Sequence, residues 1–444
     1  MLPCALILCR IILGTMKWAW RGLLLSCFLI SSPAFAVKEF YSLTRSVRSL
    51  GMGGATYAVA DDAYSLFSNP AGLGLKRRTT QIMLSTQTHL STGAIGAVYD
   101  LSDTLNSSNS FQNQVTSLLE YQGRPFHANA GFLIHYLQGH FGVGILMADT
   151  KLNLAFLGRE LDTNLDFTAI SDSGVVVGYG DEFLDRNLLV GLNFKGIYRA
   201  GGRVSYSVLD FVQTSRRIRS DLSELGGAGL GYDFDLGLMY RLPNSMNRPQ
   251  IVETRLGLSL NNILGSDFVN HRQGGAPPRL ARTFSLGARM SLEGWSVIDN
   301  FHLAFDFAEL GLGGEADGDL GARKESAWKH INFGVEAPIR GWLIPRMGFH
   351  QGLLTLGLGM NFKYTMIDFA WYGEELGYGV GRLSSRRLAL RLAFGLGAAP
   401  EPPIARVAKV NDSSTDDEVE QLSEGLEKMG EIKVMPPQSS TPER

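Results

Sequence analysis

Residues 229 to 240 read GLGYDFDLGLMY and alternate between two kinds of side chain. The large apolar set is Leu230, Tyr232, Phe234, Leu236, Leu238 and Tyr240, and the other set consists of glycines with Asp233 and Asp235. Successive side chains of a β-strand point to opposite faces, so this spacing predicts a strand with one apolar face and one small, polar face.

The same two-residue period recurs along most of the chain. It predicts strands near residues 91–100, 127–138, 140–148, 169–180, 188–199, 229–241, 253–263, 281–290, 300–308, 329–337, 341–350, 353–362, 364–372 and 386–395. Residues 79–87 carry the pattern as well, so the number of strands can shift by one. Strand boundaries predicted in this way carry an error of about 2–4 residues.

The length of these strands separates two all-β architectures. A soluble β-sandwich also alternates, but its strands average about 5–6 residues and its outer face carries charges of both signs. Here the strands approach the roughly 9–11 residues that cross a bilayer, and only 19% of residues are charged. Several strands also end in aromatic residues that could form an interfacial girdle: Tyr136, Tyr198, Tyr240, Trp342 and Trp371. We therefore predict an all-β fold, a transmembrane antiparallel β-barrel of about 14 strands.

The connections between these strands predict an orientation. Long gaps are expected at 101–126, 149–168, 200–228, 264–280, 309–328 and 373–385, and they mostly alternate with short ones. Outer-membrane barrels have short periplasmic turns and long outer loops. The long gaps are therefore expected outside the cell, and the end of the last strand in the periplasm.

Residues 45 to 75, RSVRSLGMGGATYAVADDAYSLFSNPAGLGL, form the densest cluster of small residues and turn signals. The glycines Gly51, Gly53 and Gly54 allow tight turns or a close approach to another surface. Asp61 or Asp62 could cap a short helix from Ala63 to Phe67, and Asn69-Pro70 would stop it. No G-x-G-x-x-G spacing and no Gly-Lys-Ser/Thr follows, which excludes a phosphate-binding loop.

This segment resembles the N-terminal segment of FadL/PorV-type outer-membrane β-barrels. The resemblance rests on the order R-S-L-G-M-G-G-A, then A-V-A-D-D, then N-P-A-G-L, and the strand-loop-strand of residues 364–394 matches the closing hairpin of that superfamily more weakly. The resemblance implies that residues 37–78 form a plug, or hatch, inside a barrel of residues 79–396. The hatch residues it points to are Gly51, Gly53, Gly54, Asp61, Asp62, Asn69 and Pro70.

Residues 16–36 have the features of a secretory signal peptide. Lys17 and Arg21 precede an apolar core, and Ala34-Phe35-Ala36 is an A-x-A cleavage site. We expect residues 1–36 to be removed before Val37, with translation starting at Met16 and residues 1–15 lying outside the natural chain. A lipoprotein site at Cys27 and an uncleaved anchor are the weaker alternatives, since the apolar core has only about half of the ~20 residues that a spanning helix needs.

The face expected to point inward carries charges of both signs. They are Lys195, Asp233, Asp235, Arg255, Arg289, Asp306, Glu336, Arg387 and Arg391. Buried charges need partners or water, so the first interpretation is a structural ion-pair network that braces the wall against the hatch. A ligand-orienting site among them is the alternative. Loop residues that could form an apolar groove, or simply pack within the loops, are Phe111, Leu118, Leu119, Phe211, Phe268 and Val269.

Composition and motifs exclude several other functions. All three cysteines lie within the first 36 residues, so the processed chain has no disulfide and no cysteine metal site. A formal net charge of −2 is not the balance of a nucleic-acid-binding protein. No H-E-x-x-H or G-x-S-x-G pattern occurs. We therefore predict no catalytic residues, no metal and no cofactor.

The last segment, residues 397–444, changes in composition. Prolines flank a charged centre, and Thr415 and Glu418 form a capping box ahead of apolar residues at helical spacing. We expect a disordered periplasmic tail with one short amphipathic helix, either without a partner or docking to a periplasmic protein.

Two functions remain open for this predicted barrel in a Gram-negative outer membrane. The FadL type of the resemblance implies passive uptake of hydrophobic small molecules such as long-chain fatty acids. The PorV type implies a non-conducting adaptor for protein secretion or for periplasmic partners. The expected partners are outer-membrane lipid and a hydrophobic small molecule, or a periplasmic protein through the tail, and no nucleic acid.

Overall fold

A computed structural model describes residues 42–75, 77–93, 116, 119–159, 162–207, 227–243, 251–265, 267–270, 277–311, 326–377 and 379–397. The predicted signal peptide and the predicted tail beyond Gly397 lie outside these residues. The chain divides by its internal contacts into Met1–Pro400, which contains every described residue, and Glu401–Arg444. Among the described residues, no helix is both long enough and apolar enough to cross a membrane.

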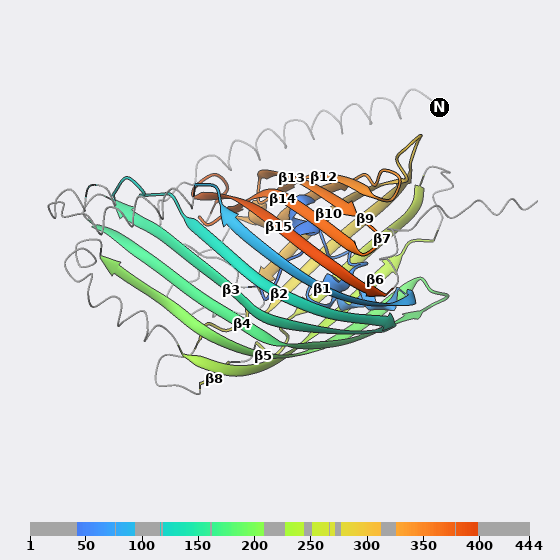
Figure 1. Cartoon of the computed structure of the whole chain (residues 1–444), viewed down its shortest axis with the longest axis horizontal. Coiled ribbons are helices and arrows are strands. Elements are labelled where there is room, and N and C mark those ends of the chain that lie inside the picture. Colours follow the sequence, from blue (N-terminus) through green and yellow to red (C-terminus); the bar gives the residue numbers. More distant parts are fainter. Residues whose placement is uncertain are drawn as a thin grey trace, which may run out of the picture. The chain divides into compact units, whose positions relative to one another are not determined.

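The described strands form one antiparallel sheet that closes on itself (Figure 1). The wall strands are β1 (Arg77–Ser91), β2 (Phe126–Gly139), β3 (Phe141–Arg159), β4 (Asp162–Phe183), β5 (Leu188–Ser207), β6 (Ala228–Arg241), β7 (Ile251–Asn261), β9 (Thr283–Glu293), β10 (Asn300–Gly311), β11 (Ile331–Glu336), β12 (Leu343–His350), β13 (Leu353–Asn361), β14 (Thr365–Glu375) and β15 (Ser384–Gly397). Each pairs with its neighbour, and β1 pairs with β15 to complete the ring. The predicted antiparallel barrel of about 14 strands is confirmed.

A two-residue strand, β8 (Val269–Asn270), pairs with β6 beyond the end of β7 at Asn261. It pairs with Gly229 and Leu230, whereas β7 pairs with β6 only from Leu236 onward. The connection between β7 and β9 therefore occupies a place in the sheet that β7 itself does not reach.

Two predictions about the wall are wrong. The first described strand is Arg77–Ser91, which bears out the pattern at residues 79–87, whereas the strand predicted at 91–100 does not begin there, because Thr92 and Gly93 form a turn; residues 94–100 lie outside the described part. The expected long loop at 149–168 is instead a continuation of β3 and β4, with only 160–161 between them. The phase of β3 changes at Ala148, which has a φ of 48° and marks a bulge, so the alternation before it does not continue after it.

The outward face is apolar. Exposed large side chains occur on nearly every strand, among them Ile145, Leu192, Phe305, Leu356 and Phe394, each at least 40% exposed. Aromatic residues lie near the short turns, including Trp295, Trp342 and Tyr364. A closed sheet leaves no unpaired edge, which is what lipid requires of a spanning structure. The described residues therefore form a membrane-spanning barrel.

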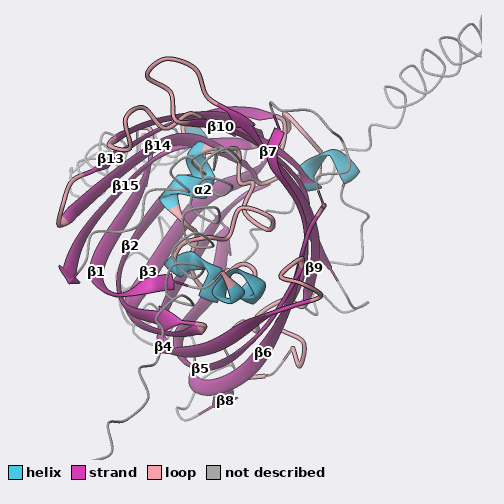
Figure 2. Ribbon diagram, turned by 90° about the vertical axis from the view of Figure 1, so that its right-hand side faces the viewer, coloured by secondary structure: helices cyan, strands magenta, loops and turns pink. Residues whose placement is uncertain are grey.

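Residues 42–75, the hatch, run inside this barrel (Figure 2). The hatch contains a short helix α2 (Val47–Gly51) and two 3₁₀ helices, η1 (Ala63–Leu66) and η2 (Pro70–Gly74). A third 3₁₀ helix, η3 (Ala327–His330), precedes β11. Nearly all hatch side chains are buried, and they pack on the inward faces of β3, β4, β10, β14 and β15.

Candidate functional site

The hatch folds locally by the signals in its sequence. The Asp62 carboxylate accepts a hydrogen bond from the Tyr64 amide and caps η1. Asn69 caps η2 in the same way by accepting from the Ala71 amide, with Pro70 at the first helical position, where its missing N–H does no harm. Asn69-Pro70 thus begins a second helix, which differs from the expectation that it would only end the first. The Asp61 carboxylate pairs with Arg48 of the hatch and with Arg289 of the wall.

The hatch backbone lies directly on glycines of the wall. A Cβ added at Gly237 would lie 2.0 Å from the side-chain oxygen of Asn69. A Cβ added at Gly334 would lie 2.1 Å from the backbone carbonyl oxygen of Met52. The wall glycines at which an added Cβ would meet hatch backbone are Gly180, Gly191, Gly237, Gly257, Gly287, Gly334, Gly348 and Gly357. We call this set the glycine seat. No other residue type lets two backbones approach so closely.

The hatch glycines complete this fit. Gly53 and Gly54 have φ values of 66° and 81°, in the left-handed region that glycine adopts without strain. A Cβ at Gly53 would lie 2.2 Å from the Phe333 carbonyl oxygen, and Gly51 lies against Gly357. The turn at 51–54 therefore requires glycine both for its conformation and for its contact with the wall.

Polar side chains of the wall bind hatch backbone groups. The Asp306 carboxylate accepts from the amides of Thr56 and Tyr57 at 2.6 and 3.1 Å. The Asn193 amide donates to the Leu66 carbonyl at 2.6 Å. In the other direction, the Asn69 side chain donates to the Leu238 carbonyl of β6 at 3.3 Å. The Asp306 bonds satisfy amides of the hatch loop between α2 and η1, and the Asn193 bond satisfies a carbonyl at the end of η1.

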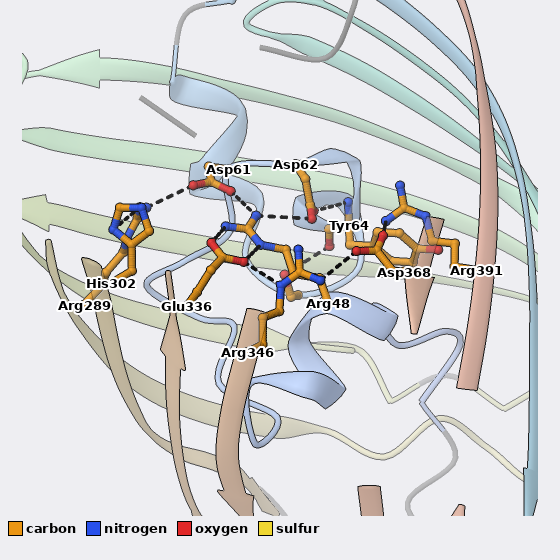
Figure 3. A network of polar contacts seen from close by, with 11 residues as sticks. Arg48, Asp61, Asp62, Tyr64, Arg289, His302, Glu336, Arg346, Asp368 and Arg391 are labelled. Carbon is orange, nitrogen blue, oxygen red and sulfur yellow. Dashed lines mark hydrogen bonds and ion pairs between the residues drawn. The ribbon is translucent and has the colours of Figure 1, made fainter. Parts of the chain in front are cut away.

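An ion-pair network joins the hatch to the wall (Figure 3). Arg48 lies 2.5 Å from Asp61 and 2.8 Å from Glu336 of β11. Glu336 also binds Arg346, which continues to Asp368 at 2.7 Å, and Asp368 pairs with Arg391 at 3.3 Å. On the other side, Asp61 binds Arg289 of β9 at 3.0 Å. Asp61 and Arg48 are thus the hatch's two points of entry into the network.

The network changes the acidity of its hatch members. Burial alone would raise the pKa of the Asp61 carboxyl, but the guanidinium groups of Arg48 and Arg289 outweigh burial and hold that pKa below its usual range. Burial raises the pKa of Tyr64 to about 12, against the nearby Arg391 cation. Arg391 lies 5.2 Å from the centre of the Tyr64 ring. Asp61 therefore stays ionised over the whole physiological pH range.

The first hatch residues, 42–46, which we call the hatch arm, are held differently. Arg45 binds Glu374 of β14 at 2.6 Å and Glu309 of β10 at 3.0 Å. Lys151 of β3 donates to the carbonyls of Ser42 and Leu43. These are long side chains, and none of the wall glycines of the seat contacts the arm.

Two cavities flank the hatch arm. The larger, of about 100 Å³, is lined on the hatch side by Leu43, Leu50, Tyr57, Tyr64 and Phe67; its wall side includes Lys195, Asn261, Thr283, Ala308 and His350. We call it the hatch cavity. The smaller, of about 50 Å³, is polar and is lined by Gln87, His89, His127, Asn129, Asp149 and Lys151 among others. Ser42, Thr44, Arg45 and Leu50 line both cavities, so the arm separates them.

The structure places all the inward charges that the sequence singled out in the buried interior. Lys195 pairs with Asp235 at 2.6 Å, Glu336 and Arg391 belong to the network above, and Arg255 lies 2.7 Å from Glu253. Asp233 accepts from the Leu264 amide, and Arg387 donates to Ser385. These residues do not gather at one point; they are spread around the wall.

One of the proposed groove residues lies elsewhere. Phe268 is buried at 4% exposure, in a cluster with Leu43, Leu146, Ile197 and Leu280, and Arg199 lies 5.1 Å from its ring centre. It therefore cannot form an external groove. Val269 is 61% exposed and Leu119 is half-buried, whereas Phe111, Leu118 and Phe211 lie outside the described residues.

Sequence reasoning missed several residues of this site. Arg45 and Arg48 stand in the segment that we quoted, but their carboxylate partners on the wall are 264 to 329 residues away, and no spacing links them. Arg346 and Asp368 lie on strands whose alternation we used, and their inward phase could have identified them. Within the described residues, no group of three or more His, Cys, Asp or Glu side chains could hold a metal ion.

Comparisons with known proteins show a likeness in fold only. No protein-family description matches the sequence, and no curated protein matches it significantly. Solved structures with a similar fold include the CymD monoaromatic hydrocarbon channel (TM-score 0.44, 12% identity, 82% of this chain and 100% of that chain). Others are the Ralstonia pickettii toluene transporter TbuX (0.42, 14%, 79% and 97%) and a Pseudomonas aeruginosa FadL homologue (0.36, 10%, 82% and 99%). At these values the likeness assigns no substrate and no mechanism to this chain.

Proposed function

We propose that this barrel mediates passive uptake of hydrophobic small molecules across the outer membrane, past its hatch. The observation that supports it best is the hatch cavity. It lies between the hatch and the inward face of the wall, and apolar and aromatic hatch side chains line it together with polar ones such as Ser46, Ser49 and Thr56. A closed wall with an apolar outer face and a partly apolar internal cavity is what a greasy solute needs on its way through a membrane.

The size of the cavity favours a small substrate. Its volume of about 100 Å³ is below the ~150 Å³ of an engineered apolar cavity that binds benzene. A long-chain fatty acid, which the resemblance suggests, would need the hatch arm to move before it could enter. A compact apolar molecule would need much less rearrangement.

A transport assay with a cavity-filling variant tests this proposal. The intact chain is produced in cells that lack their own barrel of this kind, and uptake of radiolabelled toluene and of labelled oleate is measured. Ala308→Trp places an indole in the cavity, because Ala308 is buried on the inward face of β10 and lines it. Phe305→Trp, on the outward face of the same strand, is the control.

We expect the intact chain and the control to raise toluene uptake several-fold over empty cells, and Ala308→Trp to abolish the increase. A chain that folds, as judged by heat-modifiable migration, but gives no increase for either solute contradicts the proposal.

The second candidate is a non-conducting adaptor that holds a secreted or periplasmic protein. The glycine seat favours it, because a hatch in backbone contact with strands from β4 to β13 has little room to move aside. Crosslinking in whole cells, with and without residues 400–444, tests this function. An adaptor gives a specific crosslinked partner and no solute uptake; uptake without any crosslinked partner excludes it.

The proposal also includes cleavage of the signal peptide and the orientation of the barrel. We infer that residues 1–36 are cleaved before Val37 and that the short turns face the periplasm. N-terminal sequencing of the purified barrel tests the first, and protease cleavage in intact cells tests the second.

A further inference from the structure

Three arginines stand side by side on the inward face of β6, β7 and β9. Arg241 is directly opposite Arg255 in the β6–β7 pairing, and Arg255 is directly opposite Arg289 in the β7–β9 pairing. All three side chains are on the inward face of their strands. We call them the arginine row.

This arrangement is unfavourable without compensation. Directly opposite residues on one face of an antiparallel pair have Cβ atoms about 4.5–5.5 Å apart, and like charges there destabilise the sheet. The row contains two such pairs in succession, and Arg255 and Arg289 are 0% and 1% exposed. A buried charge keeps its charge only where other groups offset it.

Three carboxylates lie against the row, but Glu253 and Asp61 are each shared between two arginines. Glu253 lies 2.7 Å from Arg255 and 3.3 Å from Arg241. Arg241 is 3.4 Å from Glu182, and Arg289 reaches Asp61, which it shares with Arg48.

Hydrogen bonding is incomplete as well. Arg255 forms an ion pair with Glu253, yet its Nε and Nη1 have no hydrogen-bond acceptor among the described residues. The Nε atom of Arg289 also lacks one, whereas the Nε atom of Arg241 lies 3.3 Å from Glu253. Buried guanidinium donors are satisfied in nearly all proteins. These donors belong to neighbouring side chains and can converge on one acceptor.

The row reaches the surface at one end. The side chains of Arg241, Glu253 and Glu182 are 24%, 18% and 17% exposed, whereas that of Arg255 is 1% exposed. They lie at the end of the barrel that carries the short turns, beside the turn between β4 and β5. An ion could therefore enter from that end past Arg241.

We propose that the arginine row is a binding site for a small oxyanion, a carboxylate or phosphate group. A guanidinium fork matches two oxygens of such a group, and charge-assisted bonds of this kind are the strong ones. The anion supplies the acceptors that Arg255 lacks and offsets the adjacent like charges. The site is separate from the hatch cavity, which none of the three arginines lines.

Titration calorimetry of the purified full-length chain in neutral detergent tests this site at low chloride. One arm uses inorganic phosphate, and the other uses short-chain phosphatidylglycerol against phosphatidylcholine. Three variants are compared: Arg255→Gln, Glu253→Gln, and Arg203→Gln as the control. Arg203 is 36% exposed and pairs with Asp166 near the opposite end of the barrel.

We expect saturable phosphate binding by the intact chain and the Arg203→Gln control. Loss of charged donors in Arg255→Gln should weaken it about tenfold or more, and Glu253→Gln should strengthen it several-fold because a competing carboxylate is removed. The opposite signs separate a binding site from a purely structural role. If only the phosphatidylglycerol arm responds, with the same dependence on Arg255, the anion is a lipid headgroup.

Heat-modifiable migration shows whether each variant is folded. If Arg255→Gln fails to fold, the Glu253→Gln variant still decides the matter through its predicted gain. No saturable binding of either anion by the intact chain, or equal binding in all variants, overturns the proposal.

Discussion

The two parts of the hatch are held in the barrel by opposite means. Residues 51–74, which we call the hatch core, pack against the glycine seat with backbone against backbone. The hatch arm, 42–46, lies between two cavities and is held by long charged side chains. Close packing has a steep dependence on distance and admits no intermediate position. Ion pairs of partly exposed side chains are weaker and tolerate movement. The hatch core is therefore the more rigid part, and under the proposed uptake function the arm is the part that a solute displaces.

The strongest test of this contrast is a wall glycine of the seat. Gly191→Val places a Cβ about where the Pro70 carbonyl stands, 2.2 Å away, so the hatch core must leave its position. Overpacking of this kind costs roughly 1–3 kcal/mol or more. We expect a large rise in ion conductance across a planar bilayer.

Gly196 provides the matched control on the same strand, because a Cβ there meets nothing within 4 Å. Gly196→Val should conduct like the unmodified chain. Equal conductance in both variants would mean that the seat does not seal the lumen.

A smaller effect is expected from Asp306→Ala, which leaves the Thr56 and Tyr57 amides without their acceptor. Each buried donor left unsatisfied costs about 1–3 kcal/mol. Amide hydrogen exchange at residues 55–60 should therefore accelerate tenfold or more. Exchange in the arm should change little, and an acceleration spread evenly over the hatch would show that the two parts are not independent.

The arm should respond more weakly still. Arg45→Gln removes both ion pairs with Glu309 and Glu374, and the Arg45 side chain is 21% exposed. We expect a loss of about 1 kcal/mol, seen as faster exchange at residues 43–47 with the hatch core unchanged. A combined Glu309→Gln and Glu374→Gln variant should reproduce it, and adding Arg45→Gln to that pair should have no further effect.

The smallest effect concerns pH. Because the pKa of Asp61 is lower in the folded chain than its usual value near ~3.9, the stability that it contributes is fully present above about pH 4 and is lost as pH falls through the folded pKa. Hatch-core exchange should thus show no contribution from Asp61 between pH 7 and 5 and a loosening only below pH 4. Asp61→Asn should remove that acidic step; a step that persists must come from another group.

Much of the wall could be predicted from the sequence because alternation is a local signal. The strand predicted at 229–241 is observed as Ala228–Arg241. The signal failed in β3, where the inward positions change from Gly142, Gly144 and Leu146 to Asp149 and Lys151 across the bulge at Ala148. A single extra residue reverses the phase, and no pattern of fixed period follows it.

The candidate site was less accessible to sequence reasoning. The motif of residues 45–75 identified the hatch glycines Gly51, Gly53 and Gly54, which lie against the wall, because tight turns have local sequence signals. Which wall residues meet Arg48 or Asp61 depends on the register of strands far along the chain. Alternation marks Glu336 and Arg289 as inward but does not show that Glu336 meets Arg48 and that Arg289 meets Asp61.

The unequal strand lengths shape the rim of the barrel. β4 has 22 residues, about 70 Å of chain, whereas β12 and β13 have 8 and 9 and meet in a turn at Gln351 and Gly352. At a tilt near 45°, β4 would rise roughly 50 Å, well beyond the ~25 Å apolar band of such barrels. The wall is thus tall at β4 and low at the turn between β12 and β13, and Phe349 is exposed just below that turn. Under the proposed uptake function, this turn is the place where the described wall stands lowest against a lipophilic solute that arrives along the membrane surface.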